Sequence, residues 1–216
     1  LTPTEVEHML RAYGVRFPEA RVAENADEAV EAAREVGYPV VVKLVSDTIA
    51  HKSDVGGVRL DLRTDDEVRR AVMDICEALA HRGLGGSVRG FNVQPLVKEG
   101  VEVIVGMTQD PKFGPLVAFG LGGVHVELMK DVAFRIHPLT DRDAREMVRE
   151  VKGFPLLTGF RGSRPADIEA LEDLILRVSA MLGDFPEITE MDLNPVKVLP
   201  EGKGCIAVDA RIRLRP

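Results

Sequence analysis

The chain has 216 residues and a formal net charge of −7. This acidic balance argues against nucleic acid or an anionic membrane as a partner, since both usually require a basic face. Cys76 and Cys205 are too few and too far apart in the sequence to indicate a zinc cluster or a disulfide framework. Without an apolar run of bilayer length or a signal-peptide pattern, the sequence predicts a soluble, cytoplasmic protein.

The first half of the chain alternates between helical and strand patterns, which is typical of an α/β fold. Thr2 and Asn25 are suited to begin two helices, and Gly14 and Gly37 are suited to end them. The β-branched run over 40–45 predicts a strand that is covered on both faces.

The remaining segments continue the alternation and end in a predicted hairpin. A break near 106–114, where glycine and proline cluster, is the expected boundary between two lobes. The expected helices cover 65–82, 141–152 and 165–182, and the expected strands lie near 58–62, 89–96, 101–108 and 115–121, followed by two final strands joined by a turn at 200–204.

Lys43 interrupts the apolar strand at 40–45. A lysine inside such a strand costs desolvation free energy unless its ammonium group reaches water or an anion, and a phosphate group would suit it. The alternative is an edge strand from which the lysine extends into solvent. The strand pattern alone leaves both interpretations open.

The loop at 46–57 follows that strand and contains candidates for phosphate chemistry. Gly56 and Gly57 would let backbone amides approach a ligand, while Lys52 and Ser53 add a charge and a hydroxyl donor. His51 could form a covalent phosphohistidine, because a neutral imidazole can attack a phosphoryl group. On spacing alone, a solvent-exposed histidine is the more common occurrence.

Asn194 and Asp209 are candidate magnesium ligands near the end of the chain. A hairpin that turns at 200–204 would bring them together, and Mg²⁺ prefers oxygen ligands when it bridges nucleotide phosphates. The alternative is that Asp192 and Asn194 merely start a turn before Pro195.

These segments in combination resemble a known family, the β subunits of ADP-forming (NDP-forming) acyl-CoA synthetases, and more distantly the β subunit of succinyl-CoA synthetase. The resemblance covers nearly the whole chain and implies an α/β ATP-grasp fold with two lobes around a nucleotide cleft. The matching segments are 38–43 (Tyr-Pro-Val-Val-Val-Lys), 51–58 (His-Lys-Ser-Asp-Val-Gly-Gly-Val), 120–123 (Gly-Leu-Gly-Gly), 192–195 (Asp-Leu-Asn-Pro) and 208–211 (Val-Asp-Ala-Arg).

The resemblance implies a role for each of the central candidates. Lys43 would contact the nucleotide phosphates, and Gly56 with Gly57 would belong to a glycine-rich lid. His51 would accept phosphate and pass it to ADP. In the resembling family the residues matching Asn194 and Asp209 bind magnesium.

Further residues would surround the nucleotide. The resemblance places Gln94, Leu96 and Val97 at the hinge that offers backbone groups to adenine, and Glu102 at the ribose hydroxyls. Arg135 could clamp phosphate through its guanidinium group, although a surface ion pair is an equal alternative.

The expected organisation is one ATP-grasp domain over 1–216. One lobe, 1–106, would carry Lys43, the lid and the hinge, and the other, 107–216, would carry the magnesium hairpin. The implied reaction is acyl-CoA + ADP + phosphate ⇌ acid + CoA + ATP, with ATP or ADP and Mg²⁺ bound here.

No CoA-binding glycine fingerprint is evident in the sequence. A CoA-binding α subunit or fused domain is therefore expected as partner, through which CoA and a small-molecule acid would bind, in a hetero-oligomer or a longer chain. Two other functions remain open: a nucleotide-sensing, synthetase-like domain of a protein acyltransferase fusion, and another ATP-grasp ligase that works without phosphohistidine.

Overall fold

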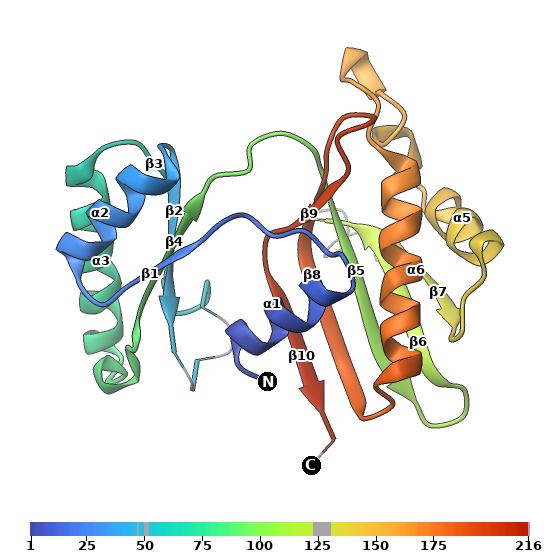
Figure 1. The fold of residues 1–216 in the computed structure, drawn as a ribbon, viewed down its shortest axis with the longest axis horizontal. Coiled ribbons are helices and arrows are strands. Elements are labelled where there is room, and N and C mark those ends of the chain that lie inside the picture. Colours follow the sequence, from blue (N-terminus) through green and yellow to red (C-terminus); the bar gives the residue numbers. More distant parts are fainter. Residues whose placement is uncertain (47, 50–51, 123–130, 216) are drawn as a thin grey trace. The chain divides into compact units, whose positions relative to one another are not determined.

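The computed structural model describes residues 1–46, 48–49, 52–122 and 131–215, and the chain forms two compact units (Figure 1). The small unit is residues 18–96, and the large unit combines residues 1–17 with 97–216. The expected boundary near 106 differs from this division, because residue 106 lies inside a long strand of the large unit. Sequence alone gave no sign that the first 17 residues join the C-terminal part of the chain.

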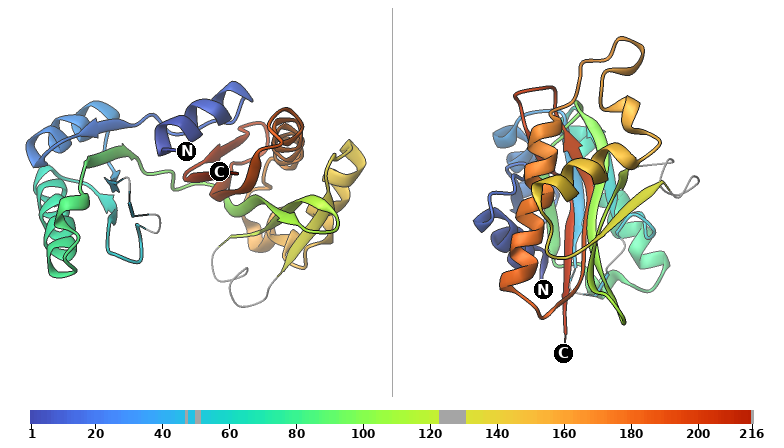
Figure 2. Two further views of the ribbon diagram at one scale, coloured as in Figure 1. Left: turned by 90° about the horizontal axis from the view of Figure 1, so that it is seen from below. Right: turned by 90° about the vertical axis from the view of Figure 1, so that its right-hand side faces the viewer.

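The small unit is an antiparallel sheet with two helices. Its strands follow the order β1-β4-β2-β3, and Figures 1 and 2 (left) show α2 and α3 on the same side of them. The elements are β1 (Arg21–Ala23), α2 (Ala26–Val36), β2 (Val40–Val45), β3 (Val58–Leu62), α3 (Asp65–His81), the short 3-10 helix η1 (Gly85–Ser87) and β4 (Gly90–Pro95).

Local sequence explains where these helices begin and end. The side chain of Asn25 accepts hydrogen bonds from the amides of Asp27 and Glu28, both at 3.0 Å, which caps α2. Gly37 then ends the helix with a φ of +86°, a conformation that suits glycine. Thr64 caps α3 in the same way by accepting from the Glu67 amide at 3.2 Å.

The large unit is a sheet with the order β10-β8-β5-β6-β7, to which β9 adds by pairing with β8. Sequence analysis missed β7 and merged β9 with β10. The elements are α1 (Pro3–Ala12), β5 (Val101–Asp110), β6 (Gly114–Leu121), β7 (Val132–Ile136), α5 (Asp141–Glu150), η2 (Phe154–Leu156), η3 (Phe160–Gly162), α6 (Ile168–Asp184), β8 (Ile188–Val198), β9 (Cys205–Ala207) and β10 (Ala210–Leu214).

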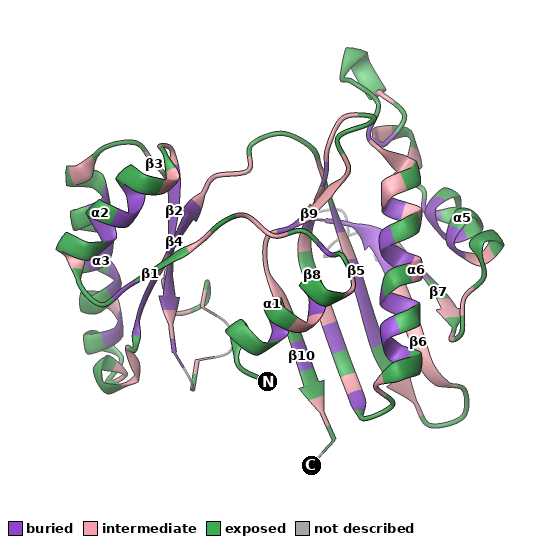
Figure 3. Cartoon of the chain, in the orientation of Figure 1, coloured by how far each residue is buried: buried purple, intermediate pink, exposed green. Residues whose placement is uncertain are grey.

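Burial shows which face of each sheet its helices cover. In the large unit, Leu171, Ile175 and Val178 of α6 share a core with Val105 and Leu193 of the sheet, and Figure 3 shows the resulting stripe of buried residues along α6. In the small unit, alternate strand residues face α2 and α3. They are Val40, Val42 and Leu44 of β2 and Phe91 and Val93 of β4. The opposite face of each sheet is therefore the place to look for functional side chains.

Candidate functional site

Lys43 lies on the face of the four-stranded sheet opposite to α2 and α3. Strand pairing places Val22, Asn92, Lys43 and Val58 in one row across all four strands. The side chains of adjacent strand residues point to opposite faces, so this row faces away from the helix-covered core. Lys43 is 8% exposed and its strand runs between two others, so the edge-strand alternative is wrong.

The segment after β2 is fixed to the end of that strand by backbone hydrogen bonds. The Leu44 amide donates to the Gly57 carbonyl, and the Gly57 amide donates to the Lys52 carbonyl, both at 2.7 Å. Gly56 has a φ of +73°, and a Cβ on Gly57 would lie 3.1 Å from the Cβ of Leu44. The backbone conformation thus favours glycine at position 56, and the closeness of Leu44 favours it at position 57.

Among the other loop candidates, Lys52 is half-buried and Ser53 is exposed. Ser46, at the start of the loop, accepts hydrogen bonds from the amides of Thr48 and Ile49, both at 3.3 Å. His51 lies outside the described residues. The structure therefore describes the loop residues at 48–49, before the histidine, and from 52 onward, after it.

The end of β4 has one backbone edge that no described strand covers. The Leu96 amide donates to the Pro39 carbonyl at 2.9 Å, so that amide is already bound within the small unit. Backbone groups alternate in direction along an antiparallel strand, which turns the Pro95 carbonyl to the other edge. Strand β1 pairs only as far as Val93, so no described strand pairs with the Pro95 carbonyl on that edge. Gln94 precedes it and is 5% exposed.

Glu102 lies on the face of the six-stranded sheet opposite to the helices. Its carboxylate forms an ion pair with Lys197 at 2.9 Å. Lys197 stands directly opposite Glu102 in the pairing of β5 with β8, and sequence analysis missed it because this pairing joins segments almost a hundred positions apart. Val97, the third hinge residue, is the first residue of the large unit after the small one.

Asn194 and Asp209 come together as the hairpin predicted. The Asn194 amide donates to the Asp209 carbonyl at 3.1 Å, at the point where β9 ends and β10 begins opposite β8. Their side-chain oxygens are the kind of ligand that Mg²⁺ accepts. The described residues contain no group of three or more His, Cys, Asp or Glu side chains that could hold a metal ion. A metal at this pair would therefore require further oxygens, which nucleotide phosphates and water can supply.

Arg135 has an ion-pair partner on a helix. Its guanidinium group lies 2.6 Å from the carboxylate of Glu150 in α5 and also donates to the Phe134 carbonyl at 2.8 Å. The structure thus gives Arg135 the surface ion pair that was the alternative to a phosphate clamp.

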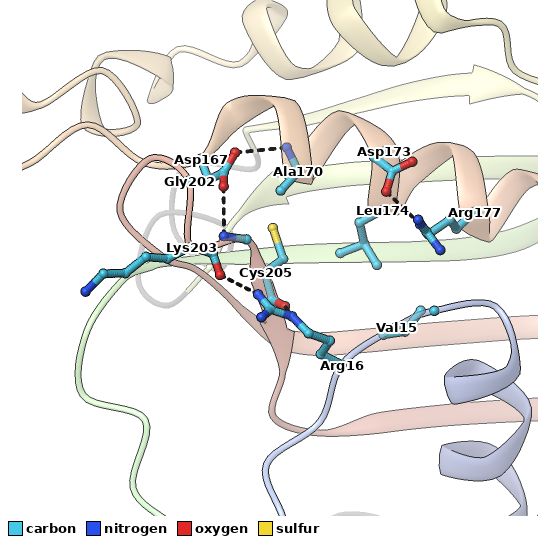
Figure 4. A pocket seen from close by; sticks show the side chains of 12 residues that line it. Val15, Arg16, Asp167, Ala170, Asp173, Leu174, Arg177, Gly202, Lys203 and Cys205 are labelled. Atoms are coloured by element: carbon cyan, nitrogen blue, oxygen red, sulfur yellow. Dashed lines mark hydrogen bonds and ion pairs between the residues drawn. The ribbon is translucent and has the colours of Figure 1, made fainter.

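A hollow of about 330 Å³ lies in the large unit between α6, the segment after α1 and the turn after β8 (Figure 4). Its charged groups bind other parts of the same unit. Asp167 accepts from the amides of Ala170, at 3.1 Å, and Gly204, at 2.8 Å. Arg16 donates to the Cys205 carbonyl at 3.1 Å, and burial raises the pKa of the Cys205 thiol to about 12. A protonated thiol is a poor nucleophile. The polar groups of the hollow therefore hold segments of the large unit together, and its cysteine is not suited to catalysis.

Comparison with known proteins identifies the fold family. The profile of the ATP-grasp domain matches residues 1–214. The chain belongs to the ATP-grasp family. Among curated relatives, the ATP-grasp chain is 46% identical over 212 residues to the acetate–CoA ligase [ADP-forming] II subunit beta of Pyrococcus furiosus, covering 98% of this chain and 90% of that one.

Two further comparisons are with a longer relative and with a solved structure that contains a nucleotide. It is 50% identical over 194 residues to acetate–CoA ligase [ADP-forming] I of Archaeoglobus fulgidus, covering 90% of this chain but only 28% of the relative. A solved structure of the dinucleotide-forming acetyl-coenzyme A synthetase 1 of Ca. Korarchaeum cryptofilum, in complex with coenzyme A and Mg-AMPPCP, has a TM-score of 0.82 at 46% identity and covers 100% of this chain and 92% of its own. In that protein the phosphohistidine segment points towards the nucleotide binding site.

No helix among the described residues is long and apolar enough to cross a membrane.

Proposed function

We propose that this chain is the nucleotide-handling half of an ADP-forming acid–CoA ligase. The overall reaction is acyl-CoA + ADP + phosphate ⇌ acid + CoA + ATP. The observation that carries the proposal is Lys43, a buried cation on the face of the small sheet opposite to α2 and α3, beside a glycine segment that is fixed to the same strand. The 46% identity to a beta subunit, in an alignment that covers 98% of this chain, supports the same reaction.

Different residues are assigned to different parts of the nucleotide. Lys43 offsets the charge of the phosphates, and the segment from Lys52 to Gly57, with Ser53 and Gly56, covers them. The hinge 94–97 receives the adenine, and Glu102 receives the ribose, where Lys197 orients its carboxylate. Arg135 is not part of this proposal because Glu150 already binds it.

Asn194 and Asp209 are the residues that would hold Mg²⁺. Their oxygens fit a hard cation, and the hydrogen bond between their backbones keeps the pair adjacent without help from a ligand. When bound, the ion supplies charge neutralisation on the phosphate oxygens. The solved complex of a relative with Mg-AMPPCP, which covers the whole of this chain, supports a magnesium-bound nucleotide.

His51 carries the phosphoryl group in this proposal. In the direction of ATP synthesis, a terminal phosphate oxygen of ADP attacks the phosphorus of phosphohistidine, an oxygen–phosphorus bond forms, and the nitrogen–phosphorus bond breaks to leave a neutral imidazole after protonation. The chain's own contribution is to position the donor and to exclude water, which would otherwise hydrolyse the phosphohistidine.

A CoA-binding half completes the enzyme, either as an α subunit or as a fused domain. The relatives differ in length in a way that fits both arrangements. One is a beta subunit of nearly the same length as this chain, and another is a longer chain of which this one covers 28%. The acid and CoA bind through that half. A cytoplasmic location belongs to the proposal as well, since Cys76 and Cys205 are free thiols, as is usual under reducing conditions.

The test follows phosphate on this chain in the presence of the CoA-binding half. With acyl-CoA and labelled phosphate, the wild-type chain should carry an acid-labile, base-stable phosphate, and His51→Ala should abolish both the label and ATP formation. Its affinity for Mg·ADP should stay within about threefold, because removing a nucleophile does not remove ground-state binding. His81→Ala, at an exposed histidine of α3, is the matched control and should change nothing.

Two outcomes would redirect the proposal. If His51→Ala makes ATP at the normal rate, the phosphoryl group does not pass through this loop. If the wild-type chain binds Mg·ADP but never acquires phosphate, a nucleotide-sensing role or a ligase without phosphohistidine replaces the proposed reaction.

A further inference from the structure

The segment from Lys52 to Gly57 forms a turn that is closed by its own backbone groups. The Gly57 amide donates to the Lys52 carbonyl at 2.7 Å, and the Gly56 amide donates to the Ser53 carbonyl at 3.0 Å. Together with the φ of +73° at Gly56, this pair of hydrogen bonds is the Schellman motif, which closes the end of a helical turn. Residues 52–57 are called the capped turn below.

Two arginine side chains bind carbonyl groups of the capped turn. Arg82, directly after α3, donates from Nη1 to the Asp54 carbonyl at 2.6 Å. Arg59, in β3, donates from Nη1 to the Gly56 carbonyl at 2.6 Å. The Arg59 bond spans three positions in the sequence, whereas the Arg82 bond spans 28. Arg82 therefore ties the capped turn to a helix that is distant in the sequence.

The capped turn also packs against the small unit. A Cβ on Gly56 would lie 3.7 Å from the Cβ of Ala78, near the end of α3. Val55 is partly buried against the core of the small unit, and so is Ile49, on the other side of position 51. The residues on both sides of the proposed phosphohistidine are thus held against this core, and Arg82 adds a directional bond to the packing.

From these contacts we infer that Arg82 is a positioning residue, which holds the capped turn in the conformation that shields the phosphohistidine at position 51 from water. The inference rests on the proposed function and adds a residue outside the parts assigned to the nucleotide. A peptide unit is planar and trans, so a carbonyl that is bound on one side turns the N–H of the same unit to the opposite side. By binding the Asp54 carbonyl, Arg82 fixes the Val55 amide so that it points away from the arginine.

The expected consequence concerns the competition between ADP and water for the phosphoryl group. In hydrolysis, a water oxygen attacks the phosphorus, the nitrogen–phosphorus bond breaks, and inorganic phosphate leaves a neutral imidazole after proton transfer. A turn released from Arg82 would admit water more often and would hold the phosphoryl group less well for ADP. Loss of Arg82 should therefore accelerate hydrolysis and slow transfer, whereas loss of a merely stabilising contact would change only the stability.

The decay of labelled phosphohistidine measures both rates. The chain is phosphorylated with acyl-CoA and labelled phosphate in the presence of the CoA-binding half, small molecules are removed, and the label is followed with and without Mg·ADP. Arg82→Met should raise the rate of label loss to water about tenfold and lower the rate of transfer to ADP by about the same factor, as expected when reacting groups are misplaced. Its affinity for Mg·ADP should stay within about threefold, because Arg82 contacts the turn and not the nucleotide.

Two matched variants separate positioning from charge and from folding. Arg82→Lys keeps a cationic donor on a long side chain and should return both rates to within about threefold of the wild type. Arg70→Met removes an exposed arginine from the same helix and should leave both rates within about twofold. The midpoint of urea denaturation should be similar in all four chains, since the Arg82 bond is exposed and exposed polar contacts contribute little to stability.

The outcomes distinguish this inference from the proposed function. If Arg82→Met loses its label to water and to ADP at the wild-type rates, whether or not its denaturation midpoint falls, Arg82 is a structural contact and the inference is wrong while the proposed function stands. If Arg70→Met matches Arg82→Met, the effect is one of net charge and the inference is also wrong. If the wild-type chain never acquires phosphate, the proposed function fails and the inference with it.

Discussion

The hollow of Figure 4 and the face of the four-stranded sheet opposite to α2 and α3 both gather polar side chains, but they differ in whether those side chains already have partners. In the hollow, Asp167 accepts two backbone amides, and Arg177 binds Asp173 at 2.6 Å. On the sheet, Asn92 and Gln94 each keep a buried polar atom without a partner among the described residues.

The difference teaches that empty volume alone does not mark a functional site. A polar group that another part of the chain already binds contributes to stability, and a ligand would have to displace that partner. A buried polar group without a partner gains a hydrogen bond when a ligand arrives, at no cost to the protein's own contacts. Substitutions in the hollow should therefore change stability, and substitutions on the sheet face should change nucleotide binding.

Removal of the Lys43 charge is expected to have the largest effect. Lys43→Met should lower the rate of ATP formation by about 10²–10³-fold, the loss typical of one preorganised group that stabilises transition-state charge. Lys203→Met, at an exposed lysine of the hollow, should stay within about twofold in the same steady-state assay. Equal losses in the two variants would erase the distinction between the regions.

The reactivity of the two thiols should differ by about a hundredfold or more. Burial raises the pKa of the Cys205 thiol to about 12, so little thiolate exists at pH 8, and the fraction grows tenfold with each unit of rising pH below 12. Cys76 is exposed. Mass spectrometry after timed alkylation should find Cys76 modified first, and rapid labelling of Cys205 at pH 8 would show that the hollow is open to reagents.

Loss of a proposed magnesium ligand should reduce affinity by a smaller factor. Asp209→Ala should weaken Mg·ADP binding at least about tenfold, a loss typical even of residues that support a metal indirectly, while metal-free ADP should bind as before. Glu190→Ala is the control, since Glu190 pairs with Arg213 at 2.8 Å on the same sheet. Calorimetry with and without Mg²⁺ measures both, and an unchanged Asp209→Ala variant would remove the magnesium assignment.

Substitutions in the hollow are expected to have the smallest effects, and these should appear only in the stability of the protein. Asp167→Ala removes the cap of α6 and the partner of the Gly204 amide, which should lower the free energy of unfolding by about 1–3 kcal/mol. Asp173→Ala breaks only an exposed pair with Arg177 and should cost about 0.3–0.5 kcal/mol. Urea denaturation measures both changes, and a loss of nucleotide affinity in Asp167→Ala would contradict the structural role of the hollow.

Local signals in the sequence predicted the helices and most of the strands. Thr2 forms the capping box with Glu5 that begins α1, and helix α6 starts at Ile168 rather than 165 because Asp167 is its cap. Strands β1 and β7 were missed, since each is short and recognisable only through its partner strand. The division of the chain was equally inaccessible, because the contacts between its first residues and its last strands are not local in sequence.

The candidate site was predictable from the sequence where a charged residue interrupts an apolar segment. Lys43 stands out in an apolar run, and its burial follows from the central position of β2. Asn92 gave no such signal, because an asparagine in a strand becomes informative only when its hydrogen-bond partners can be counted. The ion pair of Arg135 with Glu150 likewise depends on how a strand meets a helix.

The position of α1 has a consequence for synthesis of the chain. This helix precedes the small unit in the sequence, but it contacts β10, which follows all other strands of the large unit. The large unit cannot complete its core until β10 has left the ribosome, whereas residues 18–96 have all their own strands much earlier. Stalled chains that end near residue 130 should therefore already show protected amides in β2 and β4, while α1 still awaits its partner.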